Sequence, residues 1–204
     1  MLQEFKDGGG LMWFLLVCAV MGIALCLERL FTIFLRLRVD VKKFSQRLVE
    51  TVREQGVQAG IELCDKNPSP VAKVLRAALE KAGQDRTVLE DAIVRAGAAE
   101  LAFLDRGMAL IAGLTTVAPF LGFLGTVSGM ISAFKAIAAV GEVDPTVVSS
   151  GIAEALITTK WGLIIAAPLA ILHILFSGRV NGYLRDMETA SSELLDFLMT
   201  KQCK

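Results

Sequence analysis

Three long apolar stretches constrain this chain more than any other feature of its sequence. They cover residues 11–35, 107–140 and 147–177. A helix of about 20 apolar residues crosses the roughly 30 Å of hydrocarbon in a bilayer, and each stretch is longer than that. Hydrophobic residues make up 54% of the 204, an excess too large for a soluble domain of this size. The sequence therefore predicts an all-α integral membrane protein whose three transmembrane helices lie in a lipid bilayer.

The charges beside these stretches predict the orientation of the helices. Basic residues cluster directly after the first stretch, at Arg36, Arg38, Lys42, Lys43 and Arg47. Because cytoplasmic loops carry an excess of Lys and Arg, we expect this end to face the cytoplasm and residues 1–10 to lie outside. The link at 141–146 has no Lys or Arg, as expected of an external loop. The predicted topology is N-out and C-in.

The remaining segments are predicted to be helical and cytoplasmic. Residues 36–106 alternate charged and aliphatic positions with the period of an amphipathic helix. The Asn-Pro-Ser-Pro motif at 67–70 breaks this loop in two, because the residue before a proline is driven out of the helical region. A second turn is predicted at 83–85. The tail at 178–204 keeps helical periodicity, so we expect the third helix to continue into the cytoplasm.

Small residues recur on one face of the second and third stretches. Glycines fall at i, i+3 and i+7 in the second stretch, and Gly162 begins a similar pattern of small residues in the third. A helix face without large side chains lets a neighbouring helix approach to backbone contact. The residues assigned to helix packing are Gly122, Gly125, Gly129, Gly162, Pro119 and Pro168. These residues predict assembly and do not by themselves indicate a function.

Glu154 is a carboxylate about two turns inside the third stretch. An ionised carboxylate in hydrocarbon costs several kcal/mol unless it meets water, a cation or a proton. Such groups usually face a bundle interior or a wet cavity and belong to a proton or ion pathway, although a structural hydrogen bond is the alternative. We expect Glu154 to line an ion pathway.

Hydroxyl groups near Glu154 extend this polar track. Thr158 and Thr159 lie on the third stretch, and Thr126 and Ser128 lie on the second. The alternative for each threonine is a hydrogen bond to a carbonyl of its own helix. Helical spacing puts Thr158 on the face of Glu154 and Thr159 about 100° from Thr158, so geometry alone favours Thr158 as the hydroxyl beside Glu154. Ser128 stays an uncertain member of this set.

Lys160 also lies within the third stretch. Its long stem allows the ammonium to reach toward the membrane surface, or to pair with a carboxylate such as Glu154. The sequence leaves both alternatives open.

Several classes of function are not expected. The sequence has no nucleophile triad, phosphate loop or metal-ligand cluster, so we expect no enzyme, no cofactor and no bound metal. Its 21 basic and 21 acidic residues give no bulk positive charge that would indicate a nucleic-acid partner. The four cysteines form no CxxC pair and are interpreted as unpaired thiols.

Three motifs resemble the ExbB/TolQ branch of the MotA/TolQ/ExbB proton channel family. They are ERLFTIFLRLR at 28–38, APFLGFLGTVSGMISAF at 118–134 and GIAEALITTKWGLIIAAP at 151–168. The resemblance implies a subunit of the bacterial inner (cytoplasmic) membrane that forms a homopentamer around two ExbD- or TolR-like single-span proteins. Proton flow would then drive rotation and pass energy to a TonB- or TolA-like protein. Residues 1–10 and 141–146 would be periplasmic.

The resemblance also implies roles for individual residues. The family's pore residues match Thr126, Glu154 and Thr159, which ranks Thr159 above Thr158, against the spacing argument. The essential proton-binding aspartate would belong to the ExbD/TolR-like partner. Small residues usually follow the threonine pair, whereas Lys160 and Trp161 follow it here.

The alternative hypothesis is a structural membrane scaffold without ion conduction, in which Glu154 is a static hydrogen-bonding residue. The sequence leaves open whether the pathway is of the ExbB or TolQ type, which process is powered, and whether the ion is a proton or sodium.

Overall fold

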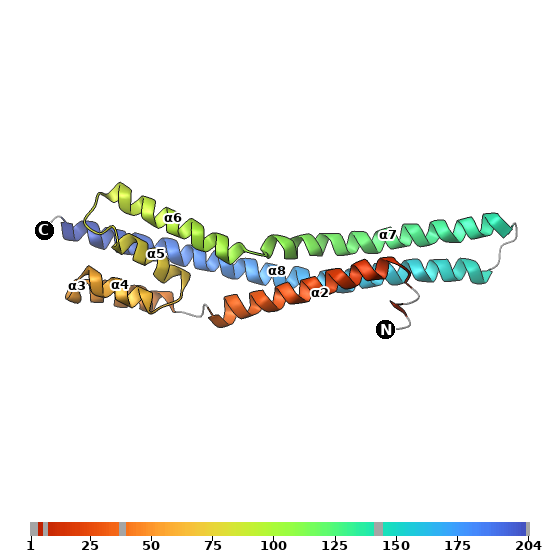
Figure 1. Cartoon of the computed structure of the whole chain (residues 1–204), viewed down its shortest axis with the longest axis horizontal. Helices are drawn as coiled ribbons and strands as arrows, with labels where there is room; N and C mark the ends of the chain where they lie inside the picture. The colour runs from red at the N-terminus through yellow and green to blue at the C-terminus, as the bar shows by residue number, and fades with distance from the viewer. Residues whose placement is uncertain (1–3, 6–7, 37–39, 141–144, 203–204) are drawn as a thin grey trace. The chain divides into compact units, whose positions relative to one another are not determined.

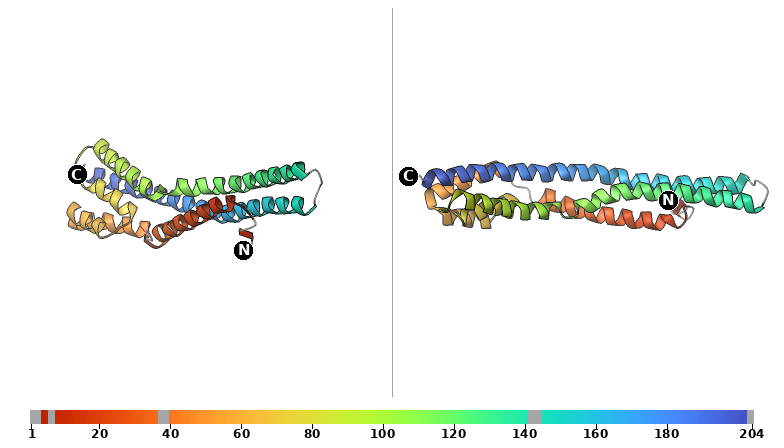
Figure 2. Two further views of the ribbon diagram at one scale, coloured as in Figure 1. Left: turned by 45° about the vertical axis from the view of Figure 1, so that its right-hand side comes forward. Right: turned by 90° about the horizontal axis from the view of Figure 1, so that it is seen from above.

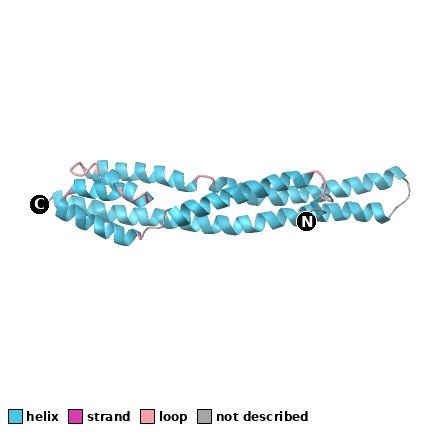
Figure 3. Ribbon diagram, turned by 60° about the horizontal axis from the view of Figure 1, so that its bottom comes forward, coloured by secondary structure: helices cyan, strands magenta, loops and turns pink. Residues whose placement is uncertain are grey.

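The computed structural model describes residues 4–5, 8–36, 40–140 and 145–202, and no strand occurs among them (Figure 3). The helices are α2 (Leu11–Leu30), a π-helical segment (Phe31–Arg36), α3 (Val41–Gln55), α4 (Val57–Asp65), α5 (Pro70–Leu79), α6 (Arg86–Asp105), α7 (Met108–Val140) and α8 (Pro145–Gln202) (Figure 1). The predictions that concern residues 141–144 and Cys203 lie outside the described residues.

Three helical stretches are long and apolar enough to cross a membrane, as judged by length and composition. They are Leu11–Ile33, Arg86–Ala138 and Ser149–Thr200. The prediction of an all-α chain with three such helices is confirmed for the described residues. The orientation of the helices, the limits of each span and the pentamer stay predictions.

The chain divides into two compact units, which are described separately. The first unit comprises Met1–Glu28 and Gly107–Leu175, and the second comprises Arg29–Arg106 and Phe176–Lys204. In the first unit, α7 and the N-terminal half of α8 run side by side as an antiparallel pair (Figure 2).

The core of the first unit forms where α2 meets the α7–α8 pair. Met12 and Leu15 of α2 are buried together with Ala118 of α7 and Ala166 of α8. The two alanines leave room for the larger side chains of α2 at this meeting point. Many other apolar side chains of this unit are exposed, as in a helix that faces lipid or another subunit.

The second unit packs the short helices α3–α6 with the C-terminal part of α8. Its buried residues include Leu48, Leu75, Leu79, Leu89 and Leu194. Side chains cap two of the short helices. The Asp40 carboxylate accepts a hydrogen bond from the backbone N–H of Lys43 (3.4 Å), and the Ser69 hydroxyl accepts one from that of Ala72 (3.2 Å). These caps satisfy backbone donors at the two helix starts.

A buried arginine stabilises the end of α6. Arg29 is 2% exposed, and its guanidinium donates hydrogen bonds to the carbonyl oxygens of Leu104 (3.1 Å) and Phe103 (3.4 Å). Carbonyls in the last turn of a helix lack partners within the helix, so a cation here satisfies them and complements the helix dipole. The sequence predicted an interfacial pair of Glu28 and Arg29 at the end of the first stretch, and did not predict the contact of Arg29 with α6.

The breaks in the helical loop have identifiable causes. The prediction of a break at 67–70 is confirmed, because α4 ends at Asp65 and α5 begins at Pro70. The turn predicted at 83–85 is also confirmed, since it precedes Arg86, the first residue of α6. The break at Gly56 was not predicted. Gly56 ends α3 with φ of +92°, a conformation that residues with a side chain rarely adopt.

Candidate functional site

The contact between α7 and α8 is made by small residues at backbone distance. A methyl group added at Gly122 would lie 2.9 Å from the carbonyl oxygen of Thr158, and one at Gly129 would lie 3.0 Å from that of Gly151. A methyl group at Gly162 of α8 would lie 2.7 Å from the carbonyl oxygen of Ala118. These distances are shorter than ordinary carbon–oxygen contacts, so the helices lie together only because these positions carry no side chain.

Two neighbouring threonines of α8 converge on one carbonyl of α7. The hydroxyls of Thr158 and Thr159 donate hydrogen bonds to the Gly122 carbonyl oxygen at 3.3 and 2.9 Å. The Thr158 hydroxyl also lies 2.8 Å from the carbonyl oxygen of Ala155. Thr158 is only 1% exposed and lies under Gly125, whereas Thr159 is half-buried. Thr159 is therefore the more accessible of the two, and its oxygen can still accept a hydrogen bond from water.

The hydroxyls of α7 are arranged differently. Thr126 is half-buried one turn beyond Gly122, and its hydroxyl donates to the Phe123 carbonyl oxygen of its own helix at 2.6 Å. Ser128 is exposed. The structure therefore brings Thr158 and Thr159 together at Gly122, while the Thr126 hydroxyl bonds within α7.

Glu154 lies in an open groove between α7 and α8. The groove has a volume of about 490 Å³, and its other lining residues are Ser132, Ala133, Ala136, Ser150, Gly151, Ala153 and Ile157. Glu154 is half-buried, and its carboxylate makes no hydrogen bond or ion pair with another described residue. A carboxylate placed in this way can exchange a proton or a cation with water in the groove.

A glycine of the N-terminal segment approaches the Glu154 carboxylate. A methyl group at Gly9 would overlap Glu154 Oε1. Gly9 also has φ of +69°, which disfavours any residue with a side chain. This neighbour was not predicted from the sequence, because the contact joins segments far apart in the chain.

Lys160 pairs with Glu4 in this structure. Its ammonium lies 2.5 Å from Glu4 Oε1. This hydrogen bond lowers the pKa of Glu4 below its ordinary value. Of the two alternatives that the sequence left open, the structure has the ion pair, with Glu4 as the partner.

Known proteins have sequences similar to that of this chain. The sequence profile of the MotA/TolQ/ExbB proton channel family matches residues 66–189. This range is more than half of the chain, and it includes Thr126, Glu154, Thr159 and the contact between α7 and α8. The chain belongs to the MotA/TolQ/ExbB proton channel family.

Relatives place the chain on the ExbB branch of this family. The chain is 32% identical over 172 residues to biopolymer transport protein exbB1 of Vibrio cholerae, covering 82% of this chain and 75% of that protein. It is 28% identical over 187 residues to an ExbB homolog of Methanothermobacter thermautotrophicus, covering 92% of this chain and 66% of that protein. A third relative, ExbB of Salmonella typhimurium, is 32% identical over 93 residues, covering 46% of this chain and 38% of that protein. The chain is thus an ExbB-like multi-pass membrane protein of a family that energises transport.

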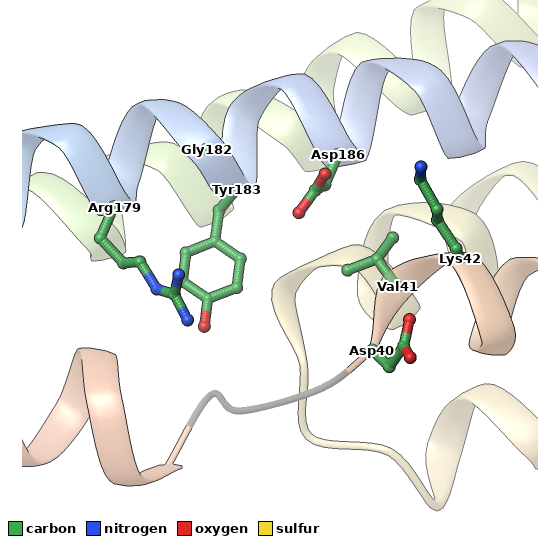
Figure 4. Close-up of a pocket in the computed structure, with 7 residues that line it drawn as sticks. All are labelled: Asp40, Val41, Lys42, Arg179, Gly182, Tyr183 and Asp186. Carbon is green, nitrogen blue, oxygen red and sulfur yellow. The ribbon is translucent and has the colours of Figure 1, made fainter.

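The second unit of this ExbB-like chain carries a polar groove of its own. It has a volume of about 300 Å³ and is lined by Asp40, Val41, Lys42, Arg179, Gly182, Tyr183 and Asp186 (Figure 4). Both signs of charge face this groove. The Asp40 carboxylate also binds Lys43, and this hydrogen bond lowers the pKa of Asp40. The groove therefore includes the residue that caps α3.

Proposed function

We propose that this chain is an ion-conducting subunit of a motor driven by the proton-motive force in the bacterial inner membrane. Five copies surround two ExbD- or TolR-like single-span proteins, and proton flow powers a TonB- or TolA-like protein. The N-terminus lies in the periplasm, and residues 36–106 and 178–204 lie in the cytoplasm. Membership of the proton channel family supports the proton as the conducted ion. The basic residues after the first span support the proposed orientation in the membrane.

One observation carries this proposal: Glu154 is a carboxylate in an apolar helix, and it lines a groove without a partner among the described residues. A structural carboxylate in hydrocarbon would be expected to accept hydrogen bonds from neighbouring groups, because an unpaired polar group is costly there. The lack of such a partner for the Glu154 carboxylate among the described residues supports a role in which a proton or a cation binds to it and leaves.

The threonines supply the next polar groups along α8. We assign Glu154 to proton binding and Thr159 to the lining of the pathway beyond it. Thr158 holds α8 against the Gly122 carbonyl and keeps the adjacent Thr159 in position. Thr126 lines the α7 side of the pathway. The acid that completes the relay belongs to the single-span partner, as the resemblance implies.

Proton uptake into liposomes tests the proposal. The chain is reconstituted with its single-span partner, and uptake under an imposed potential is compared for wild type, Glu154→Gln and Thr159→Ala. Exposed residues of the same helix provide matched controls, Glu188→Gln and Thr189→Ala. We expect uptake that depends on the partner and falls at least about tenfold in Glu154→Gln, because a barrier increase of about 1.4 kcal/mol has this effect. Uptake should fall less in Thr159→Ala and remain unchanged in both controls.

Two outcomes would contradict the proposal. If liposomes with wild type and a verified partner take up protons no faster than empty liposomes, conduction by this pair is excluded. Equal uptake in wild type, Glu154→Gln and Thr159→Ala would remove both residues from the pathway and favour a structural scaffold.

A further inference from the structure

The N-terminal segment packs along α8 through several contacts. The Phe5 ring meets the Trp13 ring edge-on, with centroids 5.2 Å apart, and Phe5 and Trp161 both pack against the buried cluster at Met12. A methyl group at Gly8 would lie 3.2 Å from Ile157 Cγ2. The described residues before α2 therefore meet α8 at several positions, Gly9 at Glu154, Gly8 at Ile157 and Glu4 at Lys160.

Glu4 is the carboxylate that this packing brings to Lys160. The two side chains are 35% and 49% exposed, so within a single chain they lie at its surface. Lys160 directly follows Thr159 on α8. A lone ammonium within a membrane span is costly and repels cations nearby, whereas a paired ammonium adds no net charge.

Helical spacing separates Lys160 from Glu154, the carboxylate on the same stretch of α8. Glu154 precedes it by six residues, which places the two side chains about 120° apart around α8. The Glu154 carboxylate lies instead against Gly9. Because Glu154 is directed elsewhere, Glu4 is the acidic group among the described residues that neutralises Lys160.

We propose that Glu4 is the counter-ion of Lys160 and that their pairing keeps an uncompensated positive charge away from the ion pathway at Thr159. The proposal rests on the function proposed above. Glu4 is a positioning residue in this view, because it acts through Lys160 and does not itself carry the ion.

A double-mutant comparison separates the electrostatic role from a structural one. Proton uptake is measured for wild type, Glu4→Gln, Lys160→Met and the double variant, each reconstituted with the single-span partner. Glu4→Gln leaves a lone cation beside the pathway, so we expect uptake to fall by about tenfold. The double variant removes both charges, so uptake should return to within about twofold of wild type. Asp91→Asn serves as a control, because it removes an exposed carboxylate from an ion pair on α6.

The outcomes are decisive in either direction. If the pair only fastens the segment, the double variant has lost the same contact as Glu4→Gln and shows the same deficit, which would overturn the proposal. Uptake by Glu4→Gln equal to that of wild type would also overturn it. In both cases wild type still conducts, so the proposed function stands. If wild type with its partner does not conduct, the proposed function fails, and this inference fails with it.

Discussion

Gly122 is a position where a single added methyl group would meet backbone atoms of the neighbouring helix. In Gly122→Ala the new carbon would lie 2.9 Å from the Thr158 carbonyl oxygen and 3.0 Å from Thr159 Cα. Both neighbours are backbone atoms and cannot rotate away. Carbon and oxygen rest at about 3.3 Å or more, and two carbons at about 3.5–4.0 Å, so α7 and α8 must separate by roughly 0.5 Å.

The expected change in stability follows from two opposing effects. Overpacking of a close contact costs about 1–3 kcal/mol. Alanine in a helix interior is more favourable than glycine by about 0.5–1 kcal/mol. The net expectation for Gly122→Ala is a loss of about 1–2 kcal/mol in the free energy of unfolding. The Thr158 and Thr159 hydroxyls should also lose part of their contact with the carbonyl of residue 122.

Gly113→Ala provides the matched control on the same helix. A methyl group at Gly113 meets no atom within 4 Å, so only the helix-propensity gain remains. We expect this variant to be unchanged or stabilised by up to about 1 kcal/mol. Reversible unfolding of the purified chain in mixed micelles, followed by circular dichroism, measures both. Equal stability of the two variants would refute the reasoning, because it would mean that α7 and α8 do not meet at Gly122.

Three further predictions concern stability. Arg29→Met should lower the free energy of unfolding by about 2–3 kcal/mol, because carbonyls at the end of α6 lose a charged hydrogen-bond donor. Arg95→Met removes an exposed ion pair and should lower it by less than about 0.5 kcal/mol. Denaturant titrations that give comparable losses for the two variants would contradict this. Burial raises the pKa of Cys64 to about 12, so above pH 9 the unfolded thiol ionises first and stability should fall with pH. A Cys64→Ala variant with an equal pH slope would exclude this cause. Gly9→Ala should destabilise by about 1 kcal/mol and Gly10→Ala should not, because only Gly9 has positive φ; similar melting curves would argue against it.

The features that sequence predicted are those set by local composition. Apolar runs longer than the thickness of a bilayer predict membrane-spanning helices. The prolines at 68 and 70 interrupt a helix whatever its tertiary contacts. The glycines of α7 were predicted to face a helix, because their spacing puts them on one side. Spacing alone did not show which helix they face.

Most of the features that were not predicted from the sequence depend on contacts between distant segments. Glu4 and Lys160 are 156 residues apart, and nothing near either residue indicates the other. The donation from Arg29 to Leu104 crosses 75 residues. The break at Gly56 depends on a local backbone conformation, since a glycine within a helical pattern is often tolerated.

The two threonines of α8 show why helical spacing was an incomplete guide to the site. Spacing prefers Thr158, which shares a face with Glu154, but a helix face is accessible only where no other helix covers it. Gly125 has no side chain, so α7 closes over Thr158 and leaves it 1% exposed, while Thr159 stays half-buried. The glycines that let the helices pack therefore also determine which hydroxyl water can reach. Packing alone therefore ranks Thr159 above Thr158, as the family resemblance does, and the loss of uptake in Thr159→Ala is the more informative measurement.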